Sequence, residues 1–205
     1  GDQEIIMGKD KKKTSYILRL GMTVLTVILI VLFLGIMGLV SKIQGTARVV
    51  NYSGLVRGST QRLIKLEDAG EPRDDLMEKI QSFIDGLQNG SDELKLVSLQ
   101  DKAFQMKMVE LNAYFQELKK ELLKVREVGY ENTDIIAMSE QFFGICDEAT
   151  SLAEDYSQRK ASELDILERI VVADIIGLLI LIGIELLKAL RYAAQNRILQ
   201  GKVYL

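Results

Sequence analysis

Arg57 is the side chain whose setting in this sequence most suggests chemistry, because it stands in an otherwise apolar line. Ile43, Val50, Arg57 and Ile64 lie seven residues apart and therefore share one face of a helix. An arginine on such a face needs a partner for its charge, and residues 49–66 contain no acidic side chain. The fork of N–H groups on a guanidinium fits a planar oxyanion. Two interpretations follow: Arg57 binds a small anion, or it pairs with an acid of another helix or with water.

Small and polar residues beside Arg57 extend the candidate site. Gly54 and Gly58 lack side chains, which lets the backbone of a partner helix approach this face closely. Ser53 and Gln61 flank the same line. If two copies of the chain pair about a two-fold axis, each brings the same Arg57 to one site. We therefore predict a homodimer with a small-molecule ligand, an anion in the first interpretation.

The stretch at residues 49–64 resembles the first outside helix of nitrate/nitrite-sensing receptor kinases and of the type IV pilus chemotaxis transducer N-terminal domain. Those families share an Asn, a Gly three residues later, an Arg three beyond that and a second Arg five further on. Here these positions are Asn51, Gly54, Arg57 and Arg62, and the chain departs from the pattern at Tyr52, Gly58 and Thr60. The resemblance implies that Arg57 contacts an anion at a dimer interface. The predicted ligand-binding residues are Arg57, Asn51, Gly54, Gly58, Gln61 and Arg62.

Composition excludes several classes of function. The 205 residues include no His, one Cys and one Pro, so a zinc site of the usual ligands and an internal disulfide are both excluded. We find no phosphate-cradling glycine loop and no nucleophile motif, and we predict no catalytic residue, no metal site and no cofactor. Residues 1–40 and 170–205 each carry a net charge of +2, whereas residues 41–169 carry −7. Basic ends around an acidic middle fit a membrane topology better than nucleic-acid binding.

Two apolar runs, residues 20–40 and 170–190, predict a protein that crosses the lipid bilayer twice. A helix of either length, at about 1.5 Å per residue, spans a hydrocarbon core of roughly 30 Å. The alternatives are a signal peptide for the first run and a buried soluble helix for the second, which contains Asp174, Glu185 and Lys188. Basic residues lie before the first run and after the second, so the positive-inside rule places both termini in the cytoplasm. We therefore predict a bacterial inner-membrane protein.

Between the two runs, apolar residues recur every three or four positions, which indicates helices. We predict an all-α fold in which two transmembrane helices flank an extracytoplasmic antiparallel four-helix bundle at residues 41–169. The expected helices are 42–69, 73–88, 100–128 and 132–169, separated at Gly70 to Pro72, Asn89 to Ser91 and Gly129, with caps for the last helix at Asn132 to Asp134. The first helix continues from residues 20–40 and the last runs into 170–190. The expected core residues are Val49, Tyr52, Val56, Ser59, Leu63, Leu66, Leu76, Ile80, Phe83, Leu87, Phe104, Met108, Leu111, Phe115, Leu118, Leu122, Val125, Ile135, Ser139, Phe142, Cys146, Ala149, Ala153 and Tyr156.

Residues 196–205 resemble the linker before a GGDEF-type diguanylate cyclase domain in clostridial-type receptors. With residues 1–19 cytoplasmic, the resemblance implies that residues 191–205 are a cytoplasmic linker to such an output domain. We expect a signal-transducing receptor module that senses a small ligand outside the cytoplasm and relays it by helix displacement. The alternative is a membrane-anchored structural or interaction protein whose bundle binds a protein or a cell-wall partner. A transport accessory is a third hypothesis, raised by Asp174 and Glu185 in the second span.

Overall fold

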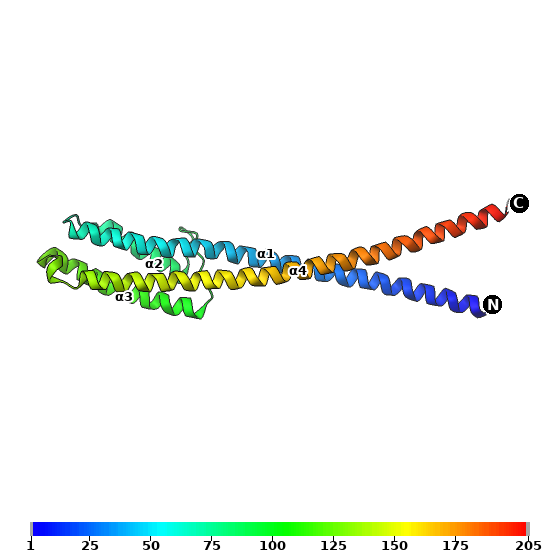
Figure 1. Ribbon diagram of the computed structural model, residues 1–205, viewed down its shortest axis with the longest axis horizontal. Coiled ribbons are helices and arrows are strands. Elements are labelled where there is room, and N and C mark those ends of the chain that lie inside the picture. The colour runs from blue at the N-terminus through cyan, green and yellow to red at the C-terminus, as the bar shows by residue number, and fades with distance from the viewer. Residues whose placement is uncertain (1, 204–205) are drawn as a thin grey trace. The chain divides into compact units, whose positions relative to one another are not determined.

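The computed structural model describes residues 2–203 and is all-α. Its elements are α1 (Asp2–Asp68), α2 (Asp74–Asn89), α3 (Lys102–Val128), the short 3-10 helix η1 (Tyr130–Asn132) and α4 (Ile135–Val203) (Figure 1). No β-strand occurs among residues 2–203, although Ser91 and Leu96 form one isolated bridge. Residues 204 and 205 at the end of the predicted cytoplasmic linker, and residue 1, lie outside the described part.

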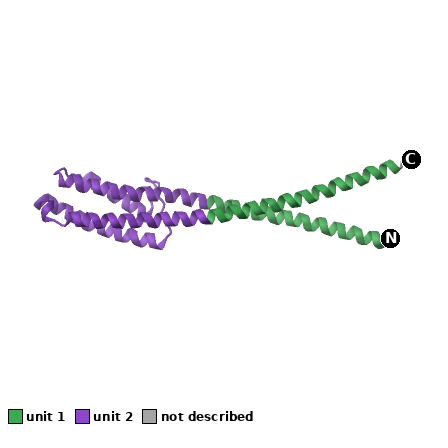
Figure 2. Ribbon diagram, in the orientation of Figure 1, with its two compact units in different colours: residues 1–38, 163–205 green, residues 39–162 purple. Residues whose placement is uncertain are grey.

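The chain divides into two compact units (Figure 2). The first unit takes residues up to 38 together with those from 163 onward, and the second takes residues 39–162. Helices α1 and α4 each contribute to both units without a break in the helix. The predicted continuation of the first and last helices of the middle region into the two apolar runs is therefore confirmed.

The first unit contains the apolar segments of α1 and α4 together with the charged residues on either side of them. Both helices are long and apolar enough to cross a membrane, which fits a membrane protein. They approach each other at glycines: Gly177 lies so close to Leu25 that an added Cβ would stand 3.3 Å from its methyl group, and Gly21 meets Leu181 in the same way at 3.4 Å. Asp174 is buried in this unit, and neither of its carboxylate oxygens has a hydrogen-bond partner among the described residues.

The second unit has one apolar core to which all four α-helices contribute. The predicted stripes of α2, α3 and α4 are confirmed: each of their expected core residues is buried. Phe104, Phe115 and Phe142 are the largest fully enclosed side chains, and the rings of Phe115 and Phe142 lie 5.7 Å apart between centroids. Packing of these apolar faces, rather than intrinsic helix propensity, supplies most of the stability of such helices.

The prediction for α1 is partly wrong: Val49, Val56 and Leu63 are buried as predicted, but the three predicted positions between and after them are not. Tyr52, Ser59 and Leu66 are only half-buried. The buried line instead comprises Thr46, Val49, Ser53, Val56, Thr60, Leu63 and Glu67, which we call the α1 seam. Its three hydroxyls donate to the carbonyl four residues earlier, at 2.7 to 2.9 Å. Because the helix itself satisfies these polar groups, they enter the core without an unpaired donor.

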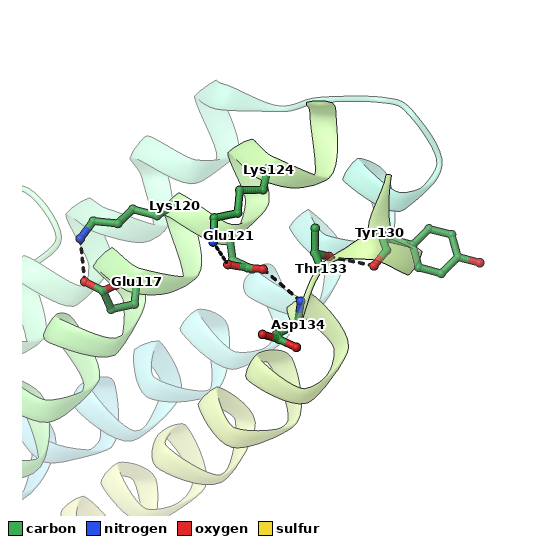
Figure 3. A network of polar contacts seen from close by, with 7 residues as sticks. All are labelled: Glu117, Lys120, Glu121, Lys124, Tyr130, Thr133 and Asp134. Carbon is green, nitrogen blue, oxygen red and sulfur yellow. Dashed lines mark hydrogen bonds and ion pairs between the residues drawn. The ribbon is translucent and has the colours of Figure 1, made fainter. Parts of the chain in front are cut away.

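The connections follow the predicted breaks, with one correction. Residues 91–99 form an ordered loop that lies against α1, where Arg48 Nε donates to the Leu94 carbonyl at 2.6 Å and Val97 packs on Gly45. The fourth helix was expected at 132 but begins at Ile135, because residues 130–132 form η1. Glu121 of α3 accepts from the Asp134 amide at 3.0 Å, which satisfies one free N–H at the start of α4 (Figure 3).

The last residue of the α1 seam is a carboxylate with an arginine partner. The Glu67 side chain is 1 % exposed, and Arg126 of α3 binds it through two nitrogens, at 2.5 and 3.0 Å. Arg126 also reaches Asp74 of α2 at 2.6 Å. These two carboxylates raise the pKa of Arg126 further above its usual range. A buried charge paired in this way fixes which residues of α1 and α3 lie opposite each other.

Replacing Arg126 by Leu is expected to lower the free energy of unfolding by about 3 kcal/mol, because it leaves the Glu67 charge buried and unpaired. A double variant, Glu67→Leu with Arg126→Leu, is expected to recover most of this loss. Urea unfolding of the full chain in detergent, followed by near-ultraviolet circular dichroism of its tyrosines, measures both.

Lys120→Leu is the matched control, since Lys120 forms an exposed ion pair with Glu117 on the same helix. Its free energy of unfolding is expected to change by less than about 0.5 kcal/mol. A loss in Arg126→Leu as small as the loss in this control contradicts the register role of the pair.

Candidate functional site

Arg57 has a partner within its own chain. Its Nη1 donates to Oδ1 of Asp147 on α4, and its guanidinium carbon lies 5.0 Å from the centre of the Phe143 ring. The Arg57 side chain is 36 % exposed and that of Asp147 is 54 % exposed. Of the interpretations left open by the sequence, pairing with an acid of another helix is therefore the arrangement in the isolated chain.

This pair does not exhaust the binding capacity of the arginine. A guanidinium has five N–H donors, and the bond to Asp147 uses one nitrogen. An ion pair this exposed contributes about 0–1 kcal/mol to stability. An oxyanion that competes with Asp147 for Arg57 therefore has little free energy to overcome. The Phe143 ring contacts the guanidinium through a cation–π interaction. The N–H donors of Arg57 that do not bond Asp147 stay available to a ligand.

Gln61 lies one turn after Arg57 and also points to α4. Its Nε2 donates to the Ser139 hydroxyl at 3.1 Å, and Ser139 is buried. Arg57 and Gln61 therefore both connect α1 to α4, at two levels of the same helix pair. A change at either contact alters how α1 and α4 pack within this unit.

The other predicted site residues lie beside this contact, with Gly54 at the border because it is three residues before Arg57 on the same helix. Asn51, Gly58 and Arg62 are exposed, and with Leu55, which is 41 % exposed, they follow one helical line at steps of four, three and four. Gly54 is half-buried, and a Cβ added at Gly54 or Gly58 would meet no atom within 4 Å among the described residues. We call Asn51, Gly54, Leu55, Gly58 and Arg62 the outer face of α1.

The six predicted residues thus form two groups rather than one pocket of a single chain. Arg57 and Gln61 belong to the α1–α4 contact, and the remaining four belong to the outer face. A ligand that touches both groups needs a second surface laid over the outer face. Among the described residues, neither a hydrogen bond nor an ion pair holds the Arg62 side chain, so its charge is free for such a surface.

Cys146 lies beside the ion pair but is buried. Desolvation, opposed in part by the charge of Arg57 and supported by that of Asp147, raises the pKa of its thiol to about 12. The thiolate is the reactive form of cysteine, so this thiol is unreactive near neutral pH. The position is packing within the predicted stripe of α4. No cluster of metal ligands occurs among the residues that the structure describes.

Sequence reasoning missed the α4 side of the contact. Asp147 and Phe143 lie four apart and directly follow the core positions Cys146 and Phe142. That adjacency to a predicted stripe is the one signal that could have suggested them, since residues flanking a buried stripe border the neighbouring helix.

No protein-family model, curated protein or solved structure matches this chain.

Cys146 is expected to resist alkylation in the folded chain, because its thiol is buried and protonated. Iodoacetamide at pH 7.5 should modify the native protein at least about 100-fold more slowly than the urea-unfolded protein, as followed by mass spectrometry. A variant with a cysteine at exposed Asp92 provides the positive control. Native labelling of Cys146 as fast as labelling of that control contradicts the burial of this side of the site.

Proposed function

We propose that the chain is a transmembrane signal-transducing receptor module of the bacterial inner membrane. Residues 20–40 and 170–190 cross the bilayer, and residues 41–169 form an antiparallel four-helix bundle outside the cytoplasm. Both termini are cytoplasmic. The bundle senses a small ligand, an anion, as a homodimer, and helix displacement carries the signal to an output domain of the diguanylate cyclase type.

The observation that carries this proposal is the unbroken course of α1 and α4. Each helix contains an apolar segment long enough to span a membrane and a stretch that lines the core of the second unit. A continuous helix transmits a shift along its axis, because its backbone hydrogen bonds hold successive turns together. Small helix shifts at packed interfaces are an established form of switching.

The composition of the α1 seam favours such movement. Thr46, Ser53 and Thr60 alternate with Val49, Val56 and Leu63 along the buried line. Small side chains bury less apolar area than Leu or Phe, so less packing energy opposes a small displacement of α1. The hydroxyls keep their bonds within α1 wherever the helix moves, because both partners belong to the same helix.

Charge and exposure support an anion bound between two copies. Arg57 and Arg62 contribute two positive charges near the outer face, against the one negative charge of Asp147. The excess is one positive charge per chain. Pairing two outer faces about a two-fold axis raises it to +2 and covers the exposed residues with a second surface. Gly54 and Gly58 permit the close helix approach that this pairing needs.

Removing Arg57 is expected to weaken anion binding, and removing the charge of Asp147 is expected to strengthen it. In calorimetric titration of the full chain in nanodiscs with nitrate and nitrite, Arg57→Ala should weaken binding at least about tenfold, or 1.4 kcal/mol. Asp147→Asn should tighten binding about threefold, because it frees the guanidinium and removes a repelling charge.

Arg73→Ala is the control, since Arg73 pairs with Asp75 at the start of α2, and this variant should bind anions as the parent does. Absence of binding at millimolar anion overturns the anion proposal. So does an affinity that Arg57→Ala and Asp147→Asn both leave unchanged.

One observation favours the alternative, a membrane-anchored structural or interaction protein. The Arg57–Asp147 pair already gives the arginine charge a partner within its own chain, as it would in a bundle that only packs. Disulfide crosslinking of Gly58→Cys, which lies on the outer face, separates the two functions. We expect a crosslinked dimer whose yield changes with the ligand. A dimer whose yield is the same with every anion tested favours the structural function, and no dimer at all contradicts both uses of this face.

A further inference from the structure

A cavity of about 410 Å³ lies where α1 and α3 both end, apart from the Arg57 site. Glu67 and Asp68 line it from the last turn of α1, and Val125, Arg126 and Gly129 line it from the end of α3. Gly70 and Pro72 of the connection after α1 and Tyr130 of η1 form the rest of the wall. Its volume falls in the range of sites for small organic ligands, roughly 300–1,000 Å³. Neither the sequence motif nor the proposed signalling function uses this cavity.

The electrostatics of the cavity favour a positive ligand. The C-terminal ends of two helices, α1 and α3, meet there, and each carries the negative end of a helix dipole. Three carboxylates, those of Glu67, Asp68 and Asp74, stand near a single cation, Arg126. Arg126 is already bonded to Glu67 and Asp74. One arginine balances one of these three negative charges, and Asp68 is the carboxylate to which Arg126 makes no bond.

Asp68 also has an unmet hydrogen-bonding requirement. Its Oδ1 is shielded from solvent and has no hydrogen-bond partner among the described residues. Desolvation, followed by the neighbouring Glu67 charge, raises the pKa of Asp68 above its usual range. A carboxylate turns easily about its terminal torsion, so either oxygen is available to a donor in the cavity. A cation placed there would supply both the missing bond and the missing charge.

Tyr130 adds an aromatic surface to the same cavity. Its carbonyl accepts from the Thr133 hydroxyl at 2.8 Å, while its ring extends away from that contact (Figure 3). The residue is 43 % exposed, so the ring retains room for a ligand. Ammonium groups bind over aromatic faces, and a tyrosine ring beside a carboxylate is a common arrangement for recognising them.

We propose that this cavity binds a small organic cation bearing a primary ammonium group, held by Asp68 and Tyr130. A metal ion fits less well, because the described residues hold no group of three or more acidic, Cys or His side chains arranged as metal ligands. An ammonium group provides three donors, and the Asp68 Oδ1 that lacks a hydrogen-bond partner can accept one of them. The site is independent of the anion site at Arg57.

Isothermal titration of the full chain in nanodiscs with 1,4-diaminobutane tests this proposal, with butane-1,4-diol as the neutral probe of the same length. We expect saturable binding of the diamine and none of the diol. Asp68→Asn should weaken diamine binding at least tenfold, and Tyr130→Leu about threefold. Asp92→Asn, which removes an exposed carboxylate far along the sequence, should bind as the parent does.

Near-ultraviolet circular dichroism confirms that each variant is folded, and Tyr130→Leu decides the question if Asp68→Asn does not fold. Three results overturn the proposal: no saturable diamine binding, equal affinity for the diol, or an affinity unchanged in both Asp68→Asn and Tyr130→Leu. Calcium binding that depends on Asp68 and displaces the diamine overturns the ligand class. Nitrate titration of the same sample distinguishes failure here from failure of the Arg57 proposal.

Discussion

The structure depends on one constraint, that the backbone of α1 and of α4 stays hydrogen-bonded along the whole length of each helix. In hydrocarbon an unpaired backbone group costs several kcal/mol, so an apolar segment that crosses a bilayer must be helical throughout. Here the same two helices continue into a packed core, and the single proline, Pro72, lies in the connection after α1 rather than inside either helix. In the receptor we propose, this continuity joins ligand binding to the membrane.

The packing of α1 combines a fixed register with a soft interface. Glu67, held by Arg126, sets the level at which α1 and α3 meet, and a buried ion pair is sensitive to any change of that level. Thr46, Ser53 and Thr60 keep their polar groups satisfied inside the helix, so the seam loses little when α1 moves slightly. The two charged regions differ in sign: the Arg57 region has excess positive charge, and the cavity beside Glu67 and Asp68 has excess negative charge. Opposite ligand charges are therefore suited to the two places.

Helix type, helix order and most of the core are predictable from periodicity, as Phe104 to Val125 and Ile135 to Tyr156 illustrate. The buried face of α1 is not fully predictable in this way, because helical spacing from the aromatic Tyr52 also selects Ser59. The residues that are buried instead, Ser53 and Thr60, can enter the core because their hydroxyls bond to the backbone of their own helix. The pairing of Arg57 with Asp147 is also beyond a single sequence. Residues 90 apart meet only when core packing has set the register of α1 against α4, and periodicity says which face is buried but not which turn lies opposite which. The cavity likewise arises from where two helices end together.

The proposed receptor topology is tested most directly by the side of the membrane on which residues 41–169 lie. Single cysteines at Lys11, Asp92 and Gln195, all exposed positions, are introduced into a Cys146→Ala background and treated with a membrane-impermeant maleimide. In spheroplasts we expect labelling of the cysteine at position 92 alone, with those at positions 11 and 195 labelled only after the membrane is permeabilised. Protection of position 92, or equal labelling of all three positions before permeabilisation, contradicts this topology.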